Sequence, residues 1–156
     1  VAALQVGPMP VVDVWEGLAR HGNVGAVLRE GDGAGVAAVI VVDGGTDLYH
    51  PNAIRASLGT AFTVPLVASP AQAAREWLEE NGYQILAAHV GAGTNYTDIS
   101  YRQATELVLG SESHGLSDIW QGDAVTPISL PMRGVADSLN VSVTAALLFY
   151  EALRQR

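Results

Sequence analysis

The chain lacks cysteine, and it also lacks lysine, because all eight of its basic residues are arginine. The absence of cysteine excludes a disulfide framework, a thiolate zinc site and a thiol nucleophile. The absence of lysine excludes a Walker-type phosphate loop and Schiff-base chemistry. The four histidines are scattered without the spacing of a metal site, so we expect no bound metal.

Long apolar runs are missing as well. No run approaches the roughly 20 residues that a membrane-spanning helix needs, and the N-terminus shows no signal-peptide pattern. The lack of cysteine is compatible with a reducing compartment. We therefore expect a soluble cytoplasmic protein without membrane contact.

Charged residues are few, at 15% of the chain, and acidic ones dominate, which gives a net charge of −8. The 156 residues, 49% of them hydrophobic, suffice for one core and are too few for two domains. The negative charge argues against nucleic-acid binding, because phosphate backbones usually bind basic surfaces.

Apolar runs and helical patterns alternate along the chain, which predicts an α/β fold with a mostly parallel sheet and helices on both faces. We expect strands over residues 10–14, 36–43, 65–67, 83–89, 106–109 and 125–130. Helices are expected over 22–33, 51–58, 70–81 and 140–155, with a helical turn over 116–120. Ser69 is expected to cap the third helix, and Gly31 to Gly35 to end the first.

The segment before the last helix has the composition of a ligand loop. Pro131 ends an apolar run, and Gly134 permits a turn that other residues resist. Ser138 or Asn140 can then cap the helix that follows. The sequence therefore predicts a shaped loop over 129–140.

Three short motifs follow one another along the chain. They are NVGAVLR at residues 23–29, LVLGSESHGL at 107–116, and SLPM at 129–132 joined to SLNVSV at 138–143. In this order they resemble the motifs of the SpoU/TrmH family of RNA 2′-O-methyltransferases, within the SPOUT superfamily. Each motif alone is weak, but three in order within one small domain are specific. The resemblance covers roughly residues 12–156.

The resemblance implies a SPOUT fold, in which the C-terminal part passes through a loop to form a deep trefoil knot, an exception among protein chains. It also implies S-adenosylmethionine as the methyl donor, bound in that knot. Residues that match the family's donor contacts, or lie beside them, are Gly110, Leu130, Leu139, Ile128, Met132, Leu109, Ala88 and His89. The residue types agree, because Gly110 would let a ligand approach the backbone and the leucines could enclose a flat base. Leucines at these positions are equally typical of an ordinary core.

The family pattern also implies a set of catalytic residues: Arg29, Asn23, Glu112, Ser138 and Asn140. Arg29 would act as general base, or remain cationic, bind an adjacent phosphate and stabilise the developing alkoxide. The alternative is that Arg29 has no catalytic role and forms a surface ion pair with Glu30 or Asp32.

The other four catalytic candidates have structural alternatives. Asn23 is expected to cap the start of its helix, with its side chain near the site. Glu112 would pair with an arginine or tie down its own loop, and Ser138 and Asn140 could act only as helix caps.

Residues 140–156 are apolar on nearly all sides, which a monomer could not bury. The resemblance likewise implies a homodimer, with the knot regions packed together and Arg29 near the partner's donor site. Residues 1–156 would form a single SPOUT methyltransferase domain, with residues 1–10 a linker from a missing N-terminal RNA-binding domain.

The resemblance thus implies methyl transfer from S-adenosylmethionine to a ribose 2′-hydroxyl of RNA. Ribosomal RNA is favoured over transfer RNA, because the chain stops soon after its last helix. The alternatives are a transfer-RNA methyltransferase and a non-catalytic module that binds the donor or RNA. The second alternative is motivated by the acidic charge and by Glu30 beside Arg29.

Overall fold

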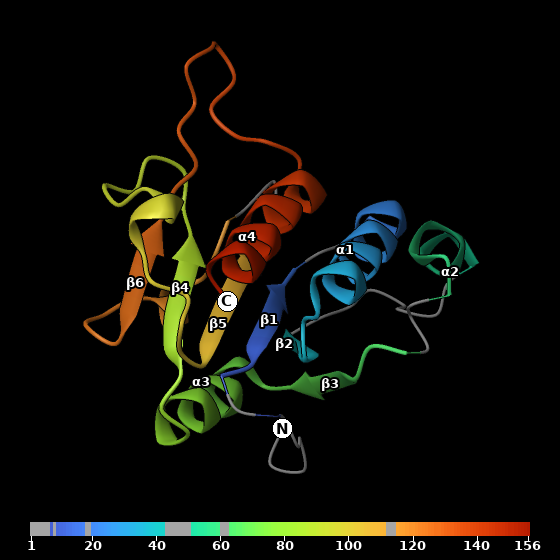
Figure 1. Cartoon of the computed structure of the whole chain (residues 1–156), viewed down its shortest axis with the longest axis horizontal. Coiled ribbons are helices and arrows are strands. Elements are labelled where there is room, and N and C mark those ends of the chain that lie inside the picture. The colour runs from blue at the N-terminus through green and yellow to red at the C-terminus, as the bar shows by residue number, and fades with distance from the viewer. Residues whose placement is uncertain (1–6, 8, 18–19, 43–50, 60–62, 112–114) are drawn as a thin grey trace.

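The structure is a computed structural model that describes residues 7, 9–17, 20–42, 51–59, 63–111 and 115–156. Its six strands form one parallel sheet in the order β3-β2-β1-β5-β4-β6 (Figure 1). They are β1 Val11–Glu16, β2 Ala38–Val42, β3 Leu66–Ser69, β4 Gln84–Ala88, β5 Thr105–Gly110 and β6 Val125–Ile128. The expected parallel α/β sheet is confirmed.

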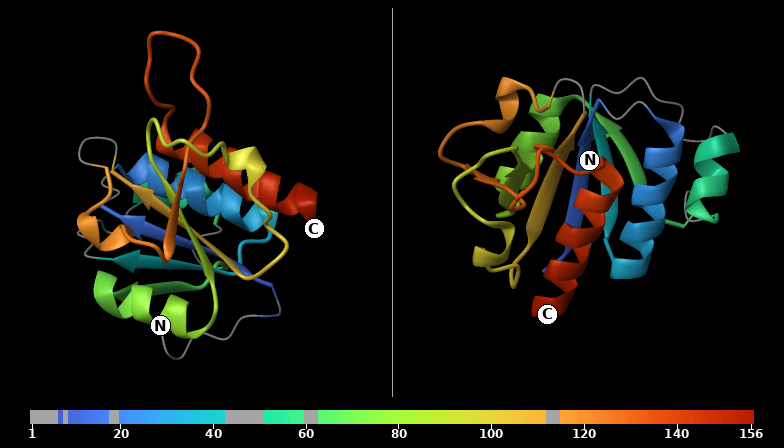
Figure 2. Two further views of the ribbon diagram at one scale, coloured as in Figure 1. Left: turned by 90° about the vertical axis from the view of Figure 1, so that its left-hand side faces the viewer. Right: turned by 90° about the horizontal axis from the view of Figure 1, so that it is seen from above.

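Helices cover both faces of this sheet. They are α1 His21–Ala34, α2 Pro51–Ser57, α3 Ala71–Glu80 and α4 Val141–Gln155, with short turns η2 Tyr96–Asp98 and η3 Asp118–Trp120. Figure 2 shows α1 and α4 side by side on one face and α3 on the other, while α2 packs outside α1. No described helix has the length and apolar character needed to cross a bilayer.

Strand β1 shows why the sheet needs cover on both sides. Val11 and Trp15 belong to the hydrophobic cluster beneath α1 and α4, whereas Val12 and Val14 belong to the cluster beneath α3. A central parallel strand is buried on both faces and therefore has few polar positions.

Two acidic residues nevertheless lie within the sheet. Asp13 of β1 and Glu106 of β5 are fully buried, and burial raises the pKa of both carboxyl groups well above their usual values. Asp13 accepts a hydrogen bond from Trp15 Nε1, whereas neither Glu106 oxygen has a partner among the described residues. Burial therefore favours the neutral form of both groups.

Helix ends agree with the expectations at two places and differ at a third. α1 ends where Gly35 adopts a φ of 78° and Val36 N–H donates to Gly31 O at 2.8 Å, as predicted from the glycines. Asn140 caps α4, accepting from Ser142 N. The cap expected at Ser69 is wrong, because Pro70 is the N-cap of α3 and Ser69 Oγ donates to Pro70 O instead.

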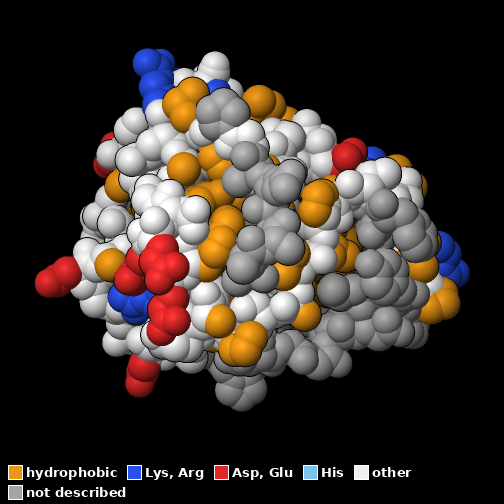
Figure 3. Space-filling view, turned by 90° about the horizontal axis from the view of Figure 1, so that it is seen from below, with side chains coloured by type: hydrophobic (Ala, Val, Ile, Leu, Met, Phe, Trp, Pro, Cys, Tyr) orange, Lys and Arg blue, Asp and Glu red, His pale blue; other side chains and the backbone are white. Residues whose placement is uncertain are grey.

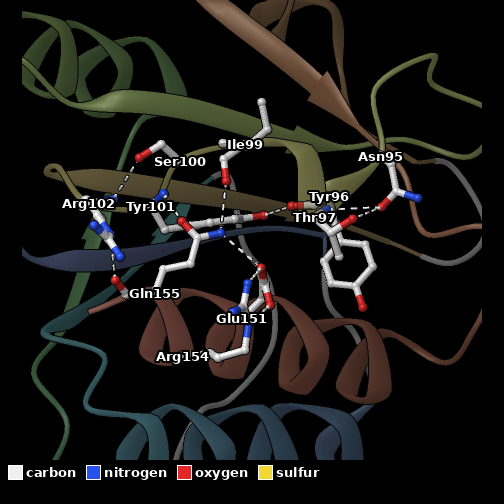
Figure 4. Close-up of polar contacts among 10 residues, drawn as sticks. All are labelled: Asn95, Tyr96, Thr97, Ile99, Ser100, Tyr101, Arg102, Glu151, Arg154 and Gln155. Carbon is white, nitrogen blue, oxygen red and sulfur yellow. Dashed lines mark hydrogen bonds and ion pairs between the residues drawn. The ribbon is translucent and has the colours of Figure 1, made fainter.

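The C-terminal end of α4 is tied to the loop before β5 (Figure 4). Gln155 Oε1 accepts from Tyr101 N at 2.8 Å, and its Nε2 donates to Ile99 O and Glu151 Oε1, both at 2.9 Å. Arg154 and Gln155 donate to the Glu151 carboxylate and lower its pKa to about 2. These contacts fix the direction of α4 and so the position of its first turn.

Candidate functional site

A pocket of ≈ 330 Å³ opens where the carboxyl ends of β4, β5 and β6 meet the first turn of α4. This is the end of a parallel sheet where α/β proteins usually bind ligands. All eight predicted donor contacts line it: Ala88, His89, Leu109, Gly110, Ile128, Leu130, Met132 and Leu139. Residues from four separate segments are therefore brought to one cavity, while their role as donor contacts stays a prediction.

Two loops that run side by side form one wall of the pocket. His89 N–H donates to Ile128 O at 2.9 Å, and Ser129 N–H donates to Thr94 O at the same distance. Ser129 Oγ also donates to Ala92 O at 2.7 Å. These bonds continue the β4–β6 pairing beyond the strands, so the strand predicted to reach residue 130 ends at Ile128 and continues only as a single bridge between Ser129 and Asn95.

The pocket walls are mainly apolar. Leu109 and Ile128 are buried, Leu130 is half-buried against the core cluster, and Leu139 is 37% exposed on the loop before α4. Leu130 therefore serves both the core and the pocket, whereas Leu139 is available mainly to a ligand. An apolar cavity with a few polar groups is typical of small-molecule sites.

Gly110 also has a structural role, beside the donor contact that stays a prediction. A Cβ at this position would lie 2.7 Å from Gly115 C and 2.8 Å from Gly115 O. The close neighbour of the Gly110 backbone is therefore the returning backbone of Gly115, whose N–H donates to Ser111 O at 2.9 Å. Gly110 is needed to let this turn close at the pocket edge.

Asn23 and Asn140 lie together beside the pocket. Asn140 Oδ1 accepts from Ser142 N at 2.9 Å, and its Nδ2 donates to Asn23 Oδ1 at 3.2 Å. Asn23 does not cap α1, because the helix begins two residues earlier, at His21, and Arg20 is the N-cap. The expectation of a cap at Asn23 is therefore wrong, although its side chain does reach the third motif.

A sequence model of the SpoU rRNA Methylase family matches residues 10–150. The chain belongs to this family. A relative named 23S rRNA (uridine(2479)-2′-O)-methyltransferase, from Streptomyces viridochromogenes, is 33% identical over 141 residues, covering 86% of this chain and 49% of its own length. The chain thus spans about half the length of this curated relative.

Solved structures of the SpoU family agree with the fold. A crystal structure described as an RNA 2′-O ribose methyltransferase has 41% identity and a TM-score of 0.89, covering 97% of this chain and 58% of its own. The SpoU methyltransferase AviRb from Streptomyces viridochromogenes, in complex with the cofactor AdoMet, has 29% identity and a TM-score of 0.91. That match covers 100% of this chain and 61% of the AviRb chain.

The remaining catalytic candidates of this SpoU domain are distributed differently. Ser138 lines the pocket. Arg29 is exposed on α1 and is not among the lining residues, and Glu112 falls outside the described residues. Within one chain, the structure therefore brings together Ser138, Asn140 and Asn23 but leaves Arg29 apart.

Arg29 interacts electrostatically with its neighbour Glu30. Burial raises the pKa of Glu30 to about 7, and the positive charge of Arg29 opposes the rise. The Oε2 atom of Glu30 is buried without a hydrogen-bond partner among the described residues. This carboxyl group therefore titrates near neutral pH, beside the arginine expected to act in catalysis.

Several pocket residues were not predicted from the sequence. They are Val90, Ser111, Gly115, Ser129, Asp137, Val141 and Thr144. Val141 and Thr144 could have been found from their spacing of three, which places both on one side of the first helical turn after Asn140. Asp137 lies between the two parts of the third motif and has no pattern of its own. Among the described residues, no His, Asp and Glu cluster is placed to hold a metal ion.

Proposed function

We propose that residues 1–156 form a single SPOUT methyltransferase domain that transfers the methyl group of S-adenosylmethionine to a ribose 2′-hydroxyl of RNA. The observation that carries this proposal is the pocket at the carboxyl ends of β4, β5 and β6, lined by all eight residues expected to contact the donor. The AdoMet complex of AviRb, a SpoU methyltransferase with a TM-score of 0.91 to this chain, supports the choice of donor.

The residues present in the pocket fit S-adenosylmethionine. Apolar surface for the adenine and the methionine chain comes from Leu109, Ile128, Leu130 and Leu139, and polar side chains come from Asp137 and Ser138. The volume of ≈ 330 Å³ lies within the range of small-molecule sites. When bound, this donor supplies an electrophilic methyl group on a sulfonium.

A deep trefoil knot at the C-terminus is part of the proposal. β6 lies at the sheet edge beside β4, whereas α4, which follows it in the sequence, packs against α1 and β5. The connecting segment 129–140 rises above the carboxyl ends of the strands (Figure 1). In the proposed knot, this return from the edge toward the middle of the sheet is the part of the chain that passes through the loop.

The protein's own residues would hold the attacking hydroxyl, whose proton passes to water as the methyl group moves from the sulfonium to the oxygen. Ser138 and the Asn23–Asn140 pair would hold the ribose. Ser138 lines the pocket and the pair lies beside it, which supports this role. Arg29 would bind the neighbouring phosphate through its guanidinium and stabilise the developing alkoxide, since this group remains protonated. Glu112, in the second motif, is also proposed as a catalytic residue.

A homodimer would bring Arg29 to a pocket. Four residues on the outer side of α4 are between 39% and 49% exposed: Val143, Leu147, Tyr150 and Leu153. Their spacing forms an apolar stripe, which supports a partner helix packed on α4. We propose that a second copy covers this stripe and that Arg29 of one protomer acts at the donor pocket of the other.

Ribosomal RNA is the proposed substrate, with transfer RNA the alternative. The named activity of the 33% identical relative from Streptomyces viridochromogenes, on 23S rRNA, supports this preference. α3 carries Glu76, Glu79 and Glu80, and Figure 3 shows acidic side chains around an arginine on the side of the molecule where α3 lies. RNA would therefore approach the opposite end, and a further part of a longer protein would supply basic surface.

Calorimetry with S-adenosylmethionine, followed by transfer of a labelled methyl group to ribosomal and transfer RNA, tests the proposal. Binding together with transfer to ribosomal RNA is the expected result. Methylation of transfer RNA alone would make transfer RNA the substrate. Donor binding without methylation of either RNA would favour a non-catalytic module. A folded protein that does not bind the donor would contradict the methyltransferase function.

A further inference from the structure

Glu16, the last residue of β1, carries a carboxylate that the proposed chemistry does not use. Its Oε1 accepts from Ser117 N at 2.6 Å, and its Oε2 accepts from Ser117 Oγ at 2.8 Å and from Trp120 Nε1 at 3.1 Å. The donors lie 101 and 104 residues further along the chain. Hydrogen bonds to a charged acceptor are stronger than neutral ones, so this contact is a major anchor of the 115–120 segment.

The segment held by Glu16 leads directly from the pocket. Gly115 lines the cavity, and its carbonyl lies so close to Gly110 that a Cβ there would come within 2.8 Å. Glu16 is paired in register with Gly110, so the anchor and the pocket edge stand on neighbouring strands. A shift of the 115–120 segment would therefore move the backbone of Gly115 away from the pocket edge.

Trp120 adds a buried hydrogen-bond donor to the Glu16 contact. Its side chain is only 1% exposed and packs in the cluster beneath α3, while its indole N–H points to Glu16. A buried indole N–H needs an acceptor, and Glu16 supplies it. Glu16 therefore holds this short segment at two points, Ser117 in its middle and Trp120 at its end.

Arg75 holds the same turn from the other side. It donates to the backbone oxygens of Ile119 and of Gln121, the latter at 2.7 Å, and pairs with Glu79 at 2.7 Å. These contacts involve η3 and the residue after it and no residue that lines the pocket. Arg75 thus offers a matched control, because it stabilises the turn without reaching the pocket edge.

We infer that Glu16 is a positioning residue for the donor pocket: its carboxylate holds the 115–120 segment so that Gly115 stays closed against Gly110. This inference rests on the proposed function, since it concerns the affinity for the donor. The Glu16 carboxylate thereby joins β1, which precedes the first motif, to the 115–120 segment at the end of the second motif. Glu16 itself is not among the lining residues, so its effect is on binding rather than on methyl transfer.

The first experiment compares the parent with Glu16→Gln by calorimetric titration with S-adenosylmethionine. The amide replaces one acceptor oxygen by an NH₂ group, which faces an N–H or O–H donor and cannot accept. We expect the dissociation constant to rise by about tenfold. In turnover, KM for the donor should rise while kcat stays close to that of the parent, and Glu16→Asp should restore part of the affinity.

Arg75→Met separates positioning from plain stabilisation. It should lower the melting temperature, as Glu16→Gln does, and leave the dissociation constant for S-adenosylmethionine unchanged. The inference is overturned if Glu16→Gln binds the donor as tightly as the parent. It is equally overturned if both variants weaken binding in proportion to their loss of stability.

Hydrogen exchange of the Ser117 amide provides a readout that needs no donor. The Ser117 amide should exchange slowly in the parent and faster in Glu16→Gln. If the Glu16 contact is unimportant, the two proteins should exchange at the same rate. A parent that fails to bind S-adenosylmethionine would contradict the proposed function, whereas unchanged exchange in Glu16→Gln would contradict the anchor. The two failures are therefore distinguishable.

Discussion

Asn140 Nδ2 donates a hydrogen bond to Asn23 Oδ1 over 3.2 Å and so joins the first turns of α4 and α1 across 117 residues. The same Asn140 side chain caps α4 by accepting from Ser142 N. Asn140 thus makes a local hydrogen bond that stabilises its own helix and a long-range one that brings the first and third motifs together. A substitution that keeps the cap but loses the Asn140 amide can test the importance of the Asn23–Asn140 pair.

Asn140→Ser is such a substitution. Serine is as good a helix cap as asparagine, but its hydroxyl is too short to reach Asn23. We expect nearly unchanged stability and a clear loss of methyl transfer, whereas Asn140→Ala should also cost about 1 kcal/mol of stability. Urea unfolding and a transfer assay on the two variants check this. Full activity in Asn140→Ser would show that the link to Asn23 is dispensable.

Leu139→Arg should abolish binding of S-adenosylmethionine. Leu139 lines the pocket while remaining 37% exposed, so the arginine can be accommodated in the folded protein yet places a charge in the apolar cavity. We expect binding to weaken by about a hundredfold or more in calorimetry. Val135→Arg, on the same loop but fully exposed and not among the lining residues, should bind like the parent.

Gly110→Ala should lower both stability and donor affinity. The new Cβ would lie 2.7 Å from the Gly115 backbone, which cannot move aside as a flexible side chain could. We expect a loss of about 1–3 kcal/mol in the free energy of unfolding. Gly134→Ala is the control, because a Cβ there meets nothing within 4 Å. Equal effects of the two changes in thermal unfolding would show that the contact with Gly115 is not tight.

The strands and helices were largely predictable because their signals are local. The apolar run at 36–43 contains β2, Pro51 begins α2, and Gly35 ends α1, each determined by the residues of the element itself. The second and third motifs likewise contain many of the pocket residues, since these motifs lie at the ends of β5 and β6 and at the start of α4. Local patterns therefore gave the sheet and one wall of the site.

Contacts between distant residues could not be predicted in the same way. The sequence predicts Asn23 as a helix cap because capping is a local property, and no residue near Asn23 indicates a contact with Asn140. Glu16 carries no pattern that indicates Ser117 or Trp120, and Asp13 lies in a strand whose other residues are mainly apolar. These contacts depend on how the elements meet in space, which the sequence pattern of one element does not determine.

Glu30→Gln should change the pH dependence of stability. The pKa of Glu30 is raised from 4.5 to about 7, so between these values the folded protein holds a proton that the unfolded chain has lost. Stability of the parent therefore falls as pH rises through this window, and the loss is complete above it. The variant lacks this carboxyl group. Its free energy of unfolding should therefore equal that of the parent below pH 4.5 and exceed it by a constant amount above pH 7.

Urea unfolding across that pH range measures the difference between Glu30→Gln and the parent. The effect should be modest, because Glu30 is only partly buried and solvent screens its charge. Asp32→Asn, which removes an exposed carboxylate from the same helix, is the matched control. A difference between Glu30→Gln and the parent that stays constant with pH would contradict the raised pKa.

Mixed protomers can show whether Arg29 acts at the partner's pocket. Arg29→Ala leaves its own donor pocket intact, because Arg29 is not among the lining residues, and Leu139→Arg leaves its own Arg29 intact. Each variant alone should be inactive in methyl transfer. In a dimer of one of each, the pocket of the Arg29→Ala protomer would meet Arg29 of its partner, which completes one site.

Random mixing of equal amounts would make half of the dimers mixed, each with one complete site of two, so about a quarter of the parent's activity should return. If Arg29 acted within its own chain, every site would lack either the arginine or the donor, and mixing would restore nothing. Mixing Arg29→Ala with Val135→Arg provides the reference, because the second variant retains both its pocket and its arginine. The transfer rate of the two mixtures therefore decides between the two arrangements.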